Sequence, residues 1–355
     1  MAGYREARLY AYSNARVKAM ESELIPRSTM DELAKQESVE PILARLLQTS
    51  YMRSIEEYGG AKIRSELVDF ALSSDLAKNL AKLERVTPKP KRKLMLLFIG
   101  RFEMENAKLL IDAKAKQRRF EEIERFLVET GSMRKVSMKE AYQNEHDVEA
   151  LAARIGRMMP YKEIMSRAMS EYAKSKNVLE AENEIDRQFY RTVSDSFDLL
   201  SKTSPESAKL IRREIEMKNI LTLMRAKRYG LTEEEVSRSI IGNGITSHNA
   251  LLALFKSAKS VDELASGIKS FDLKEALALY QQSKGTQTLR FEIAMRNSLF
   301  RMALHLLRHS VLSFGTLAGY AYIKQMEVLA LRTLVDGKQN GLSSEEIGGM
   351  IAWNK

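Results

Sequence analysis

Three acidic side chains stand at equivalent positions of a repeated stretch, and they are the first residues of this sequence that could carry chemistry. In the first two copies the acid is followed by an amide and a lysine at fixed spacing. The members are Glu103, Asn106 and Lys114, then Glu216, Asn219 and Lys227, then Glu327 and Lys338. Carboxylates that gather in one place can hold a metal ion or exchange protons. A repeat offers a simpler interpretation, in which one structural contact of the fold is made three times.

The stretch that contains these residues occurs three times without internal gaps, at residues 101–128, 214–241 and 325–351. Glu103 and Glu216 are 113 positions apart, and Glu216 and Glu327 are 111 apart. Residues three or four positions apart share one face of a helix, and in the first copy such a face is mostly apolar. We expect its asparagine to bond to a loop or to the end of a neighbouring helix, because an unsatisfied buried amide costs roughly 1–3 kcal/mol.

The elements that must position these side chains are a long helix, a tight turn and a second helix. The signals of the second and third copies are Gly230 with Thr232 and Glu235, and Gly341 with Ser343 and Glu346. A glycine just beyond the last helical turn predicts a left-handed residue, and Ser or Thr three residues before Glu predicts a capping box. The first copy has Gln117 and Arg119 at the glycine and cap positions. We therefore expect its turn to differ in shape, before a helix at 120–129.

The composition predicts an all-α protein large enough to bury several cores. The chain has 355 residues with only 6 Pro and 17 Gly, and strong helix formers dominate it. The repeat period exceeds 100 residues, which indicates small domains rather than the short repeats of a solenoid. We predict three similar helical domains, at residues 1–131, 132–244 and 245–355.

Most kinds of catalytic or cofactor site lack their signals. With 0 Cys there is no disulfide, thiolate nucleophile or thiolate metal site, and no glycine-rich phosphate loop occurs. His305 and His309 have the i, i+4 spacing of a zinc pair, but no third ligand is indicated, so we interpret them as surface or packing residues. We predict no catalytic, cofactor-binding or metal-binding residue. The longest apolar run, at 94–99, is far shorter than the roughly 20 residues that span a bilayer, so any membrane association is expected to be peripheral.

The formal net charge of +10 is compatible with an acidic protein, an anionic membrane or nucleic acid as partner. Positive charge is dense at 89–93 and again in the turns of the repeat. The candidate partner contacts in these turns are Lys114, Lys116, Arg118, Arg119, Lys227, Arg228 and Lys338. Solvated helix ends would give the same pattern, because cations suit the negative end of a helix dipole. No interleaved aromatic residues indicate base stacking.

Taken together, the motifs resemble those of the C subunit of archaeal and bacterial A/V-type ATPases, which is related to the V-ATPase d subunit of eukaryotes. The motifs are ExxNxxxLxxAK at 103–114 and 216–227, each followed by a turn and Glu-Glu-Ile or Glu-Glu-Val, with YSNARV at 12–17, LQTSY at 47–51 and YAYIK at 320–324. Their order covers essentially the whole chain. Gln117 and Ala330 depart from the pattern, at positions where the other copies have Gly and Asn.

This resemblance implies a non-catalytic rotor part, built of three similar helical domains arranged as a funnel. Its partners would be the central-shaft subunits (D and F type) and the membrane proteolipid ring, and it would couple ATP synthesis or hydrolysis to ion translocation. It would lie peripherally at the cytoplasmic face of the cell membrane, with no cofactor, nucleic acid or small-molecule substrate. Two other interpretations stay open, a helical scaffold unrelated to the motor and a basic RNA-binding protein.

Overall fold

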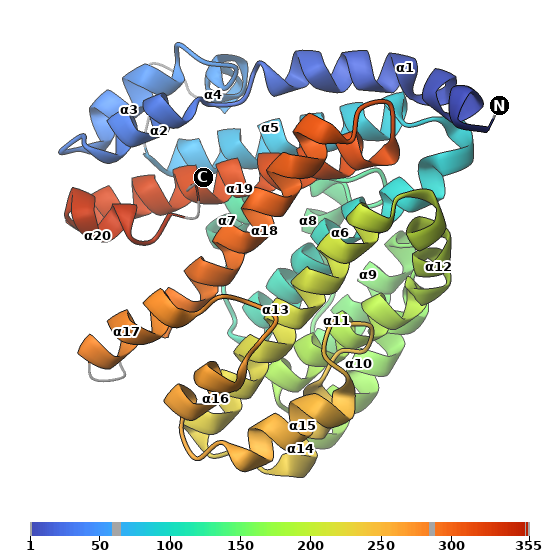
Figure 1. Ribbon diagram of the computed structural model, residues 1–355, viewed down its shortest axis with the longest axis vertical. Coiled ribbons are helices and arrows are strands. Elements are labelled where there is room, and N and C mark those ends of the chain that lie inside the picture. The colour runs from blue at the N-terminus through green and yellow to red at the C-terminus, as the bar shows by residue number, and fades with distance from the viewer. Residues whose placement is uncertain (1, 59–64, 284–287, 352, 354–355) are drawn as a thin grey trace.

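The chain folds into helices joined by turns, as a computed structural model that describes residues 2–58, 65–283, 288–351 and 353 shows (Figure 1). No strand occurs within these ranges. The all-α prediction is therefore confirmed.

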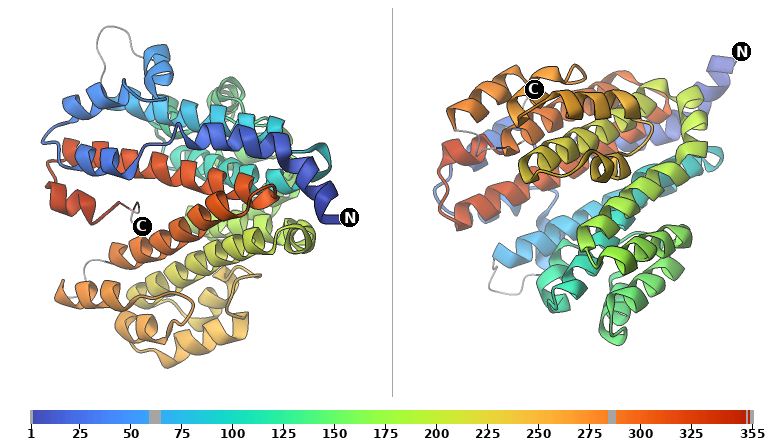
Figure 2. Two further views of the ribbon diagram at one scale, coloured as in Figure 1. Left: turned by 45° about the horizontal axis from the view of Figure 1, so that its top comes forward. Right: turned by 90° about the horizontal axis from the view of Figure 1, so that it is seen from below.

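Three long helices carry the three repeated copies. They are α6 (Arg92–Ala115), α13 (Pro205–Tyr229) and α19 (Phe314–Gln339). Their N-terminal halves contact one another, whereas the short helices that follow α13 and α19 lie at separate corners of the molecule (Figures 1 and 2). The three helices therefore meet at one end and spread apart at the other.

Each of the first two long helices is followed by the same succession of helices. After α6 come α7 (Phe120–Ile123), η2 (Glu124–Phe126), α8 (Lys135–Asn144), α9 (Val148–Met158), α10 (Lys162–Ser175), α11 (Val178–Thr192) and α12 (Ser194–Thr203). After α13 come α14 (Glu233–Ser239), α15 (His248–Ser257), α16 (Val261–Gly267), α17 (Lys274–Gln282) and α18 (Leu289–His309). The long helix then packs on the second and fourth of the larger helices behind it, α6 on α9 and α11, and α13 on α16 and α18.

The third unit is completed by the opposite end of the chain. Only α20 (Ser344–Gly348) follows α19, and the missing helices are supplied by α2 (Arg27–Ala34), α3 (Val39–Leu46), α4 (Met52–Tyr58) and α5 (Ser65–Val86). The same contacts recur, because α19 packs on α3 and α5 and α20 packs on α2. Outside this scheme, α1 (Ala2–Glu21) lies along α5 and α19, and η1 (Lys89–Lys91) leads into α6.

The division at residues 131 and 244 stays a prediction. Packing associates each repeated helix with the segments that follow it, and α6 and α13 contact helices beyond those positions. Trp353 is buried against Phe300, with 4.8 Å between ring centroids.

Two expectations about the first copy are wrong. Gln117 adopts the left-handed conformation with φ 54°, close to the 69° of Gly230 and the 71° of Gly341. In all three turns the N–H of the next residue donates to a carbonyl of the last helical turn, over 2.9–3.0 Å, so the turns have one shape. The helix expected at 120–129 ends instead after α7 and η2, because Arg119 gives no side-chain cap and the Val128 N–H bonds to Asn106.

Candidate partner-contact surfaces and the junction between them

The repeated carboxylates each hold the segment that leads into the next larger helix. Glu216 accepts hydrogen bonds from the N–H groups of Ile245 (3.1 Å) and Thr246 (3.0 Å), just before α15. Glu103 accepts from the hydroxyls of Thr130 (3.0 Å) and Ser132, before α8. Burial raises the pKa of Glu103, and these two hydroxyls only partly offset the effect. The interpretation of these residues as one structural contact made repeatedly is confirmed for these two copies.

The third carboxylate makes the equivalent contact across almost the whole chain. Glu327 accepts from the N–H of Ile25 at 2.6 Å, just before α2, and from the hydroxyl of Tyr51 at 2.7 Å. Lys324, which also pairs with Asp75, donates to it at 2.8 Å. Lys324 is 2% exposed and Asp75, on α5, is 7% exposed, so a buried ion pair joins α19 to the N-terminal helices.

The repeated asparagines bond to loop backbone, as predicted. Asn106 donates to the carbonyl of Val128 at 2.6 Å and accepts from its N–H at 3.0 Å. Asn219 does the same with Ile241, with both bonds at 2.8 Å. Each side-chain amide thus closes the helix–turn–helix of its copy.

The lysines proposed as partner contacts are largely used within the fold. Lys114 lies 4.8 Å from the centre of the Tyr142 ring and donates to the Tyr142 carbonyl at 2.9 Å. Lys227 lies 4.1 Å from the ring of Phe255, the equivalent residue of the next unit. Lys338 donates to the hydroxyl of Ser344 at 2.8 Å. All three are half-buried: Lys114 and Lys227 hold α8 and α15 against the ends of their long helices, and Lys338 holds α20.

The other candidates are exposed on two of the three turns. Lys116 pairs with Asp112 in its own helix at 2.6 Å, and Arg119, 79% exposed, pairs with Glu122 at 3.0 Å. Arg118 and Arg228 are exposed as well. Sequence reasoning missed two exposed apolar residues at the second turn, Tyr229 (74% exposed) and Leu231 (43%). Both residues follow the buried face of α13 in the sequence, and that position was the signal that could have indicated their exposure.

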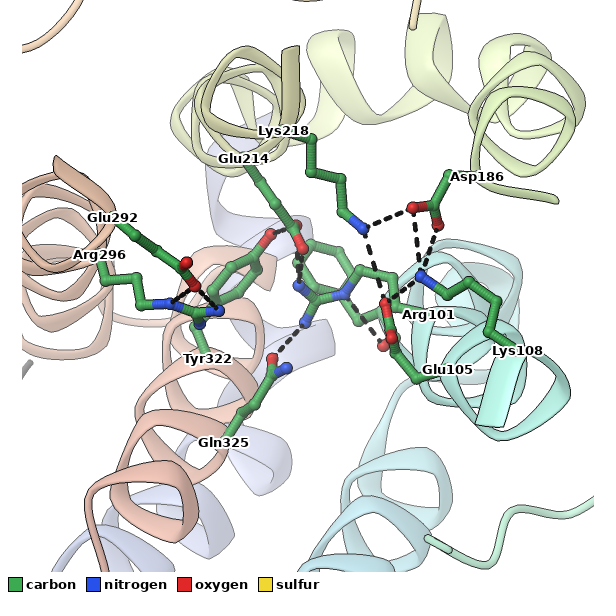
Figure 3. A network of polar contacts seen from close by, with 11 residues as sticks. Arg101, Glu105, Lys108, Asp186, Glu214, Lys218, Glu292, Arg296, Tyr322 and Gln325 are labelled. Atoms are coloured by element: carbon green, nitrogen blue, oxygen red, sulfur yellow. Dashed lines mark hydrogen bonds and ion pairs between the residues drawn. The ribbon is translucent and has the colours of Figure 1, made fainter. Parts of the chain in front are cut away.

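A buried ionic junction joins the three long helices at the first residue of each copy (Figure 3). Arg101, Glu214 and Gln325 are equivalent by the offsets of 113 and 111. Arg101 bonds to both carboxylate oxygens of Glu214, at 2.7 and 2.8 Å, and to Gln325 at 3.2 Å. The Tyr322 hydroxyl donates to Glu214, and its ring lies 4.1 Å from the guanidinium. Sequence analysis did not single out this position, because its residue type differs in every copy.

Burial and charge act against each other in this junction. Arg101 is 6% exposed and Glu214 9%. Burial alone would lower the pKa of Arg101, but the adjacent carboxylate of Glu214 and the ring of Tyr322 hold it above its ordinary value. The charged pair is therefore retained in a site that excludes water.

A second ionic group lies one helical turn further along the same helix faces. Asp186 of α11 receives Lys108 at 3.1 Å and Lys218 at 2.9 Å, and Lys218 also lies 3.6 Å from Glu105 (Figure 3). Burial would raise the pKa of Asp186, but the charges of Lys218 and Lys108 outweigh it, and the pKa lies below its ordinary value. Exposure rises here, to 57% for the Glu105 side chain, so the junction opens towards the spreading ends of the helices.

Shallow hollows flank α18 beside this opening. A hollow of about 200 Å³ separates its Leu289 and Glu292 from α19, and one of about 220 Å³ separates the same residues from Arg228 and Tyr229 of α13. A larger hollow of about 460 Å³ lies between α17, α18 and the residues after α20. Mixed charge and apolar side chains line them, as suits a protein contact.

The remaining candidate metal-binding residues do not come together in one place in the part of the chain that the structure describes. His305 and His309 lie side by side on the exposed side of α18, with 4.7 Å between the centroids of their tilted rings. Across the described ranges, no group of three or more His, Cys, Asp or Glu side chains is placed to hold a metal ion. No described helix is both long and apolar enough to cross a membrane.

Comparison with known proteins gives one consistent result. The model of the ATP synthase (C/AC39) subunit family matches residues 13–350. The chain is similar to the C subunit of the A-type ATP synthase of Methanocaldococcus jannaschii, with 24% identity over 96% of this chain and 86% of that protein. It is 25% identical to the same subunit of Methanosarcina barkeri, over 95% of this chain and 91% of that protein. The equivalent protein of Thermoplasma acidophilum is 23% identical, over 95% of this chain and 96% of that protein.

Proposed function

This chain belongs to the ATP synthase (C/AC39) subunit family, and from that premise we propose that it is a non-catalytic rotor subunit of an A/V-type ATPase or ATP synthase. It acts as a funnel-shaped socket between the central shaft and the membrane proteolipid ring. Torque passes through it between ATP synthesis or hydrolysis and ion translocation. It lies peripherally at the cytoplasmic face of the membrane, and its partners are the D- and F-type shaft subunits and the ring.

The observation that carries this proposal is the buried junction of Arg101, Glu214 and Gln325. A part that transmits torque has to be stiff where its arms meet, because a flexible joint would absorb the rotation. One terminal nitrogen of Arg101 donates to both oxygens of Glu214 and the other donates to Gln325, so one planar guanidinium ties two neighbouring helices to α6, and burial protects the ion pair from screening by salt. The junction thus locks three helices that otherwise spread apart.

The spreading ends supply the surface that we assign to the shaft. Arg119, Arg228 and Tyr229 are exposed on the first two turns, and the hollows beside α18 lie between the second turn and α19. Aromatic and arginine side chains are the residues that most often anchor protein interfaces. The interface proposed here is the rim formed by the three turns.

Photocrosslinking in the assembled membrane complex tests this assignment. A photoreactive residue in place of Tyr229 is expected to capture a shaft subunit. The matched control is Tyr12 on α1, which is similarly exposed (67% against 74%) and lies at the other end of the molecule. Crosslinks from position 12 to the shaft, with none from position 229, would show that the opposite end of the molecule faces the shaft. The rim would then not be the shaft-binding surface.

The rotor role itself has a separate test. Complexes depleted of this chain are expected to hydrolyse ATP without pumping ions, and adding the purified protein is expected to restore pumping. ATP hydrolysis by the purified chain alone, or ring–shaft complexes that couple fully without it, would contradict the role.

A further inference from the structure

Three connecting turns meet at the end of the molecule where the long helices begin, on the right-hand side of Figure 1. They join α5 to α6, α12 to α13 and α18 to α19, and so hold equivalent places in the repeat. The bonds that tie them are Lys91 to Thr203 (3.3 Å), Ser13 of α1 to the Val86 carbonyl (2.5 Å), and the Leu312 N–H to Asn14 of α1 (3.3 Å). We call this surface, together with the outer face of α1, the apex.

The apex is built from stretches without acidic residues. No Asp or Glu occurs at 7–20, 85–102 or 293–326, which together supply α1 and two of the three turns. The exposed cations of these stretches that lie on α1 or near the two turns are Arg8, Arg16, Arg85, Lys89, Arg92, Lys93 and Arg308. The third turn adds Lys202, and the acids near it are Glu206, which is paired with Lys209 at 2.7 Å, and Asp198, which is exposed on α12 beside Leu199. The charge of the apex is therefore strongly positive.

The densest cluster of positive charge in the apex lies at a helix N-terminus, where the helix dipole makes positive charge unfavourable. Lys89, Arg92 and Lys93 surround the N-terminus of α6, the positive end of the helix dipole, and the first turn of α6 has no acidic residue. Within the part of the chain that the structure describes, these three side chains form no ion pair. Local stability gives no reason for the cluster, so an anion outside the chain is the simplest account of it.

Exposed apolar side chains lie among the cations. Tyr12 is 67% exposed on α1 and Val311 is 55% exposed on the α18–α19 turn, with Leu96 (38%) at the start of α6 and Leu199 (45%) on α12. Cations that bind phosphate, mixed with tyrosine and aliphatic residues, match the interface of an anionic membrane. The phosphate-binding cations at the positive end of the α6 dipole, beside an exposed tyrosine, are the features that favour lipid headgroups, and contact with an acidic protein is an outcome of the test.

We propose that the apex binds anionic phospholipid headgroups directly, so that this chain holds the membrane surface as well as its protein partners. Such a contact extends the proposed function by giving the end opposite the rim a lipid partner. It rests on that function only in placing the chain beside a membrane. Lipid binding is a property of the purified chain, whereas the rotor role is tested in the complex, so either can fail alone.

Vesicle flotation with the purified full-length chain tests the proposal. The chain is expected to float with vesicles of phosphatidylcholine and phosphatidylglycerol, and to stay at the bottom with vesicles of phosphatidylcholine alone. The triple variant Lys89→Gln, Arg92→Gln, Lys93→Gln is expected to bind on the order of 100-fold more weakly, since each cation near an anionic surface contributes about fivefold. Replacing Tyr12 and Val311 by Ala is expected to weaken binding several-fold further.

The matched control removes the same charge at the rim, with Lys116→Gln, Arg118→Gln and Arg119→Gln, and is expected to change binding less than about threefold because those residues face away from the lipid. An equal loss in both triple variants would show diffuse attraction to net charge and overturn the proposal. Binding to neutral vesicles, or none to anionic ones, would do the same. A further outcome is that the parent chain does not float with anionic vesicles, whereas the Lys89, Arg92, Lys93 triple variant detaches from the membrane complex. That result would show that the apex contacts a protein, and it would overturn the lipid proposal.

Discussion

The three copies of the repeat differ in residue type at the junction, where their long helices contact one another, and share one backbone conformation at the turns, where they lie apart. At the junction the equivalent residues are Arg101, Glu214 and Gln325, which bond to one another. At the turns, Gln117, Gly230 and Gly341 share one left-handed conformation and one hydrogen-bond pattern, although their helix ends lie in different parts of the molecule. The copies therefore keep one backbone conformation at the turns, even where the residue type changes, whereas at the junction they need different residue types.

Electrostatics explains the difference. Three identical charges cannot meet at one buried point, since burial removes the water that would screen their repulsion. A cation, an anion and an amide can meet there and satisfy each other. A helix end, by contrast, needs the same stop wherever it stands, because its last carbonyls lack partners in every copy.

The largest effect is expected at the junction. The Arg101→Met variant leaves Glu214 buried and unpaired, and is expected to lose about 3–5 kcal/mol of unfolding free energy. Adding Glu214→Met is expected to recover at least half of the loss, because an apolar pair replaces an ion pair with little cost. Urea unfolding followed by circular dichroism measures both. A double variant no more stable than the single one would show that the charges do not act as a pair.

Replacing each repeated glutamate by glutamine is expected to cost about 1–3 kcal/mol, in the order Glu327, then Glu216, then Glu103. Glu327 loses its ion pair with Lys324. Glu216 accepts from two backbone N–H groups through one oxygen and from two hydroxyls through the other, so its amide has to take one fixed orientation, whereas Glu103 bonds only to hydroxyls, which can rotate. Urea midpoints of the three single variants give the order. Equal losses would mean that the copies are energetically the same away from the junction as well.

Acid is expected to weaken the ionic group around Asp186. Asp186 has a folded-state pKa below the unfolded value of about 3.9, so its stabilisation is present above that value and is lost as pH falls below about 4. The Asp186→Asn variant is expected to lose about 1.5 kcal/mol at neutral pH and to approach the parent at low pH. The control is Asp112→Asn, which removes the exposed pair with Lys116 and is expected to cost under about 1 kcal/mol. Equal losses in the two variants at neutral pH would contradict the comparison.

The smallest effect is expected at the first turn. The Gln117→Gly variant relieves a side chain from the left-handed region and is expected to gain about 1 kcal/mol. The reciprocal Gly230→Gln change, at φ 69° with nothing near the added Cβ, is expected to cost a similar amount. Thermal unfolding is sensitive enough to show both. Loss of stability in Gln117→Gly would mean that the glutamine side chain makes a contact worth more than the strain.

Much of the local structure was readable in advance. The long helices, the capping boxes at Thr232 and Ser343, and the loop contacts of Asn106 and Asn219 follow from spacing alone. The shape of the first turn did not follow from spacing, since Gln117 takes the left-handed conformation although it is not a residue type that favours it. The cation–π contacts of Lys114 and Lys227 were hidden as well, because their aromatic partners lie 28 residues further along the chain in each case.

The sequence by itself determined the helices, their stops and the fact that one unit is repeated, because helix propensity, capping and amphipathic spacing act over a few residues. Only the tertiary structure decided how the copies meet. It brought Arg101 to Glu214 and Gln325, and it completed the third unit from the N-terminal helices through Glu327 and Ile25, 302 residues apart. Such contacts depend on which buried surfaces find each other in the folded chain, and no spacing along the sequence records that.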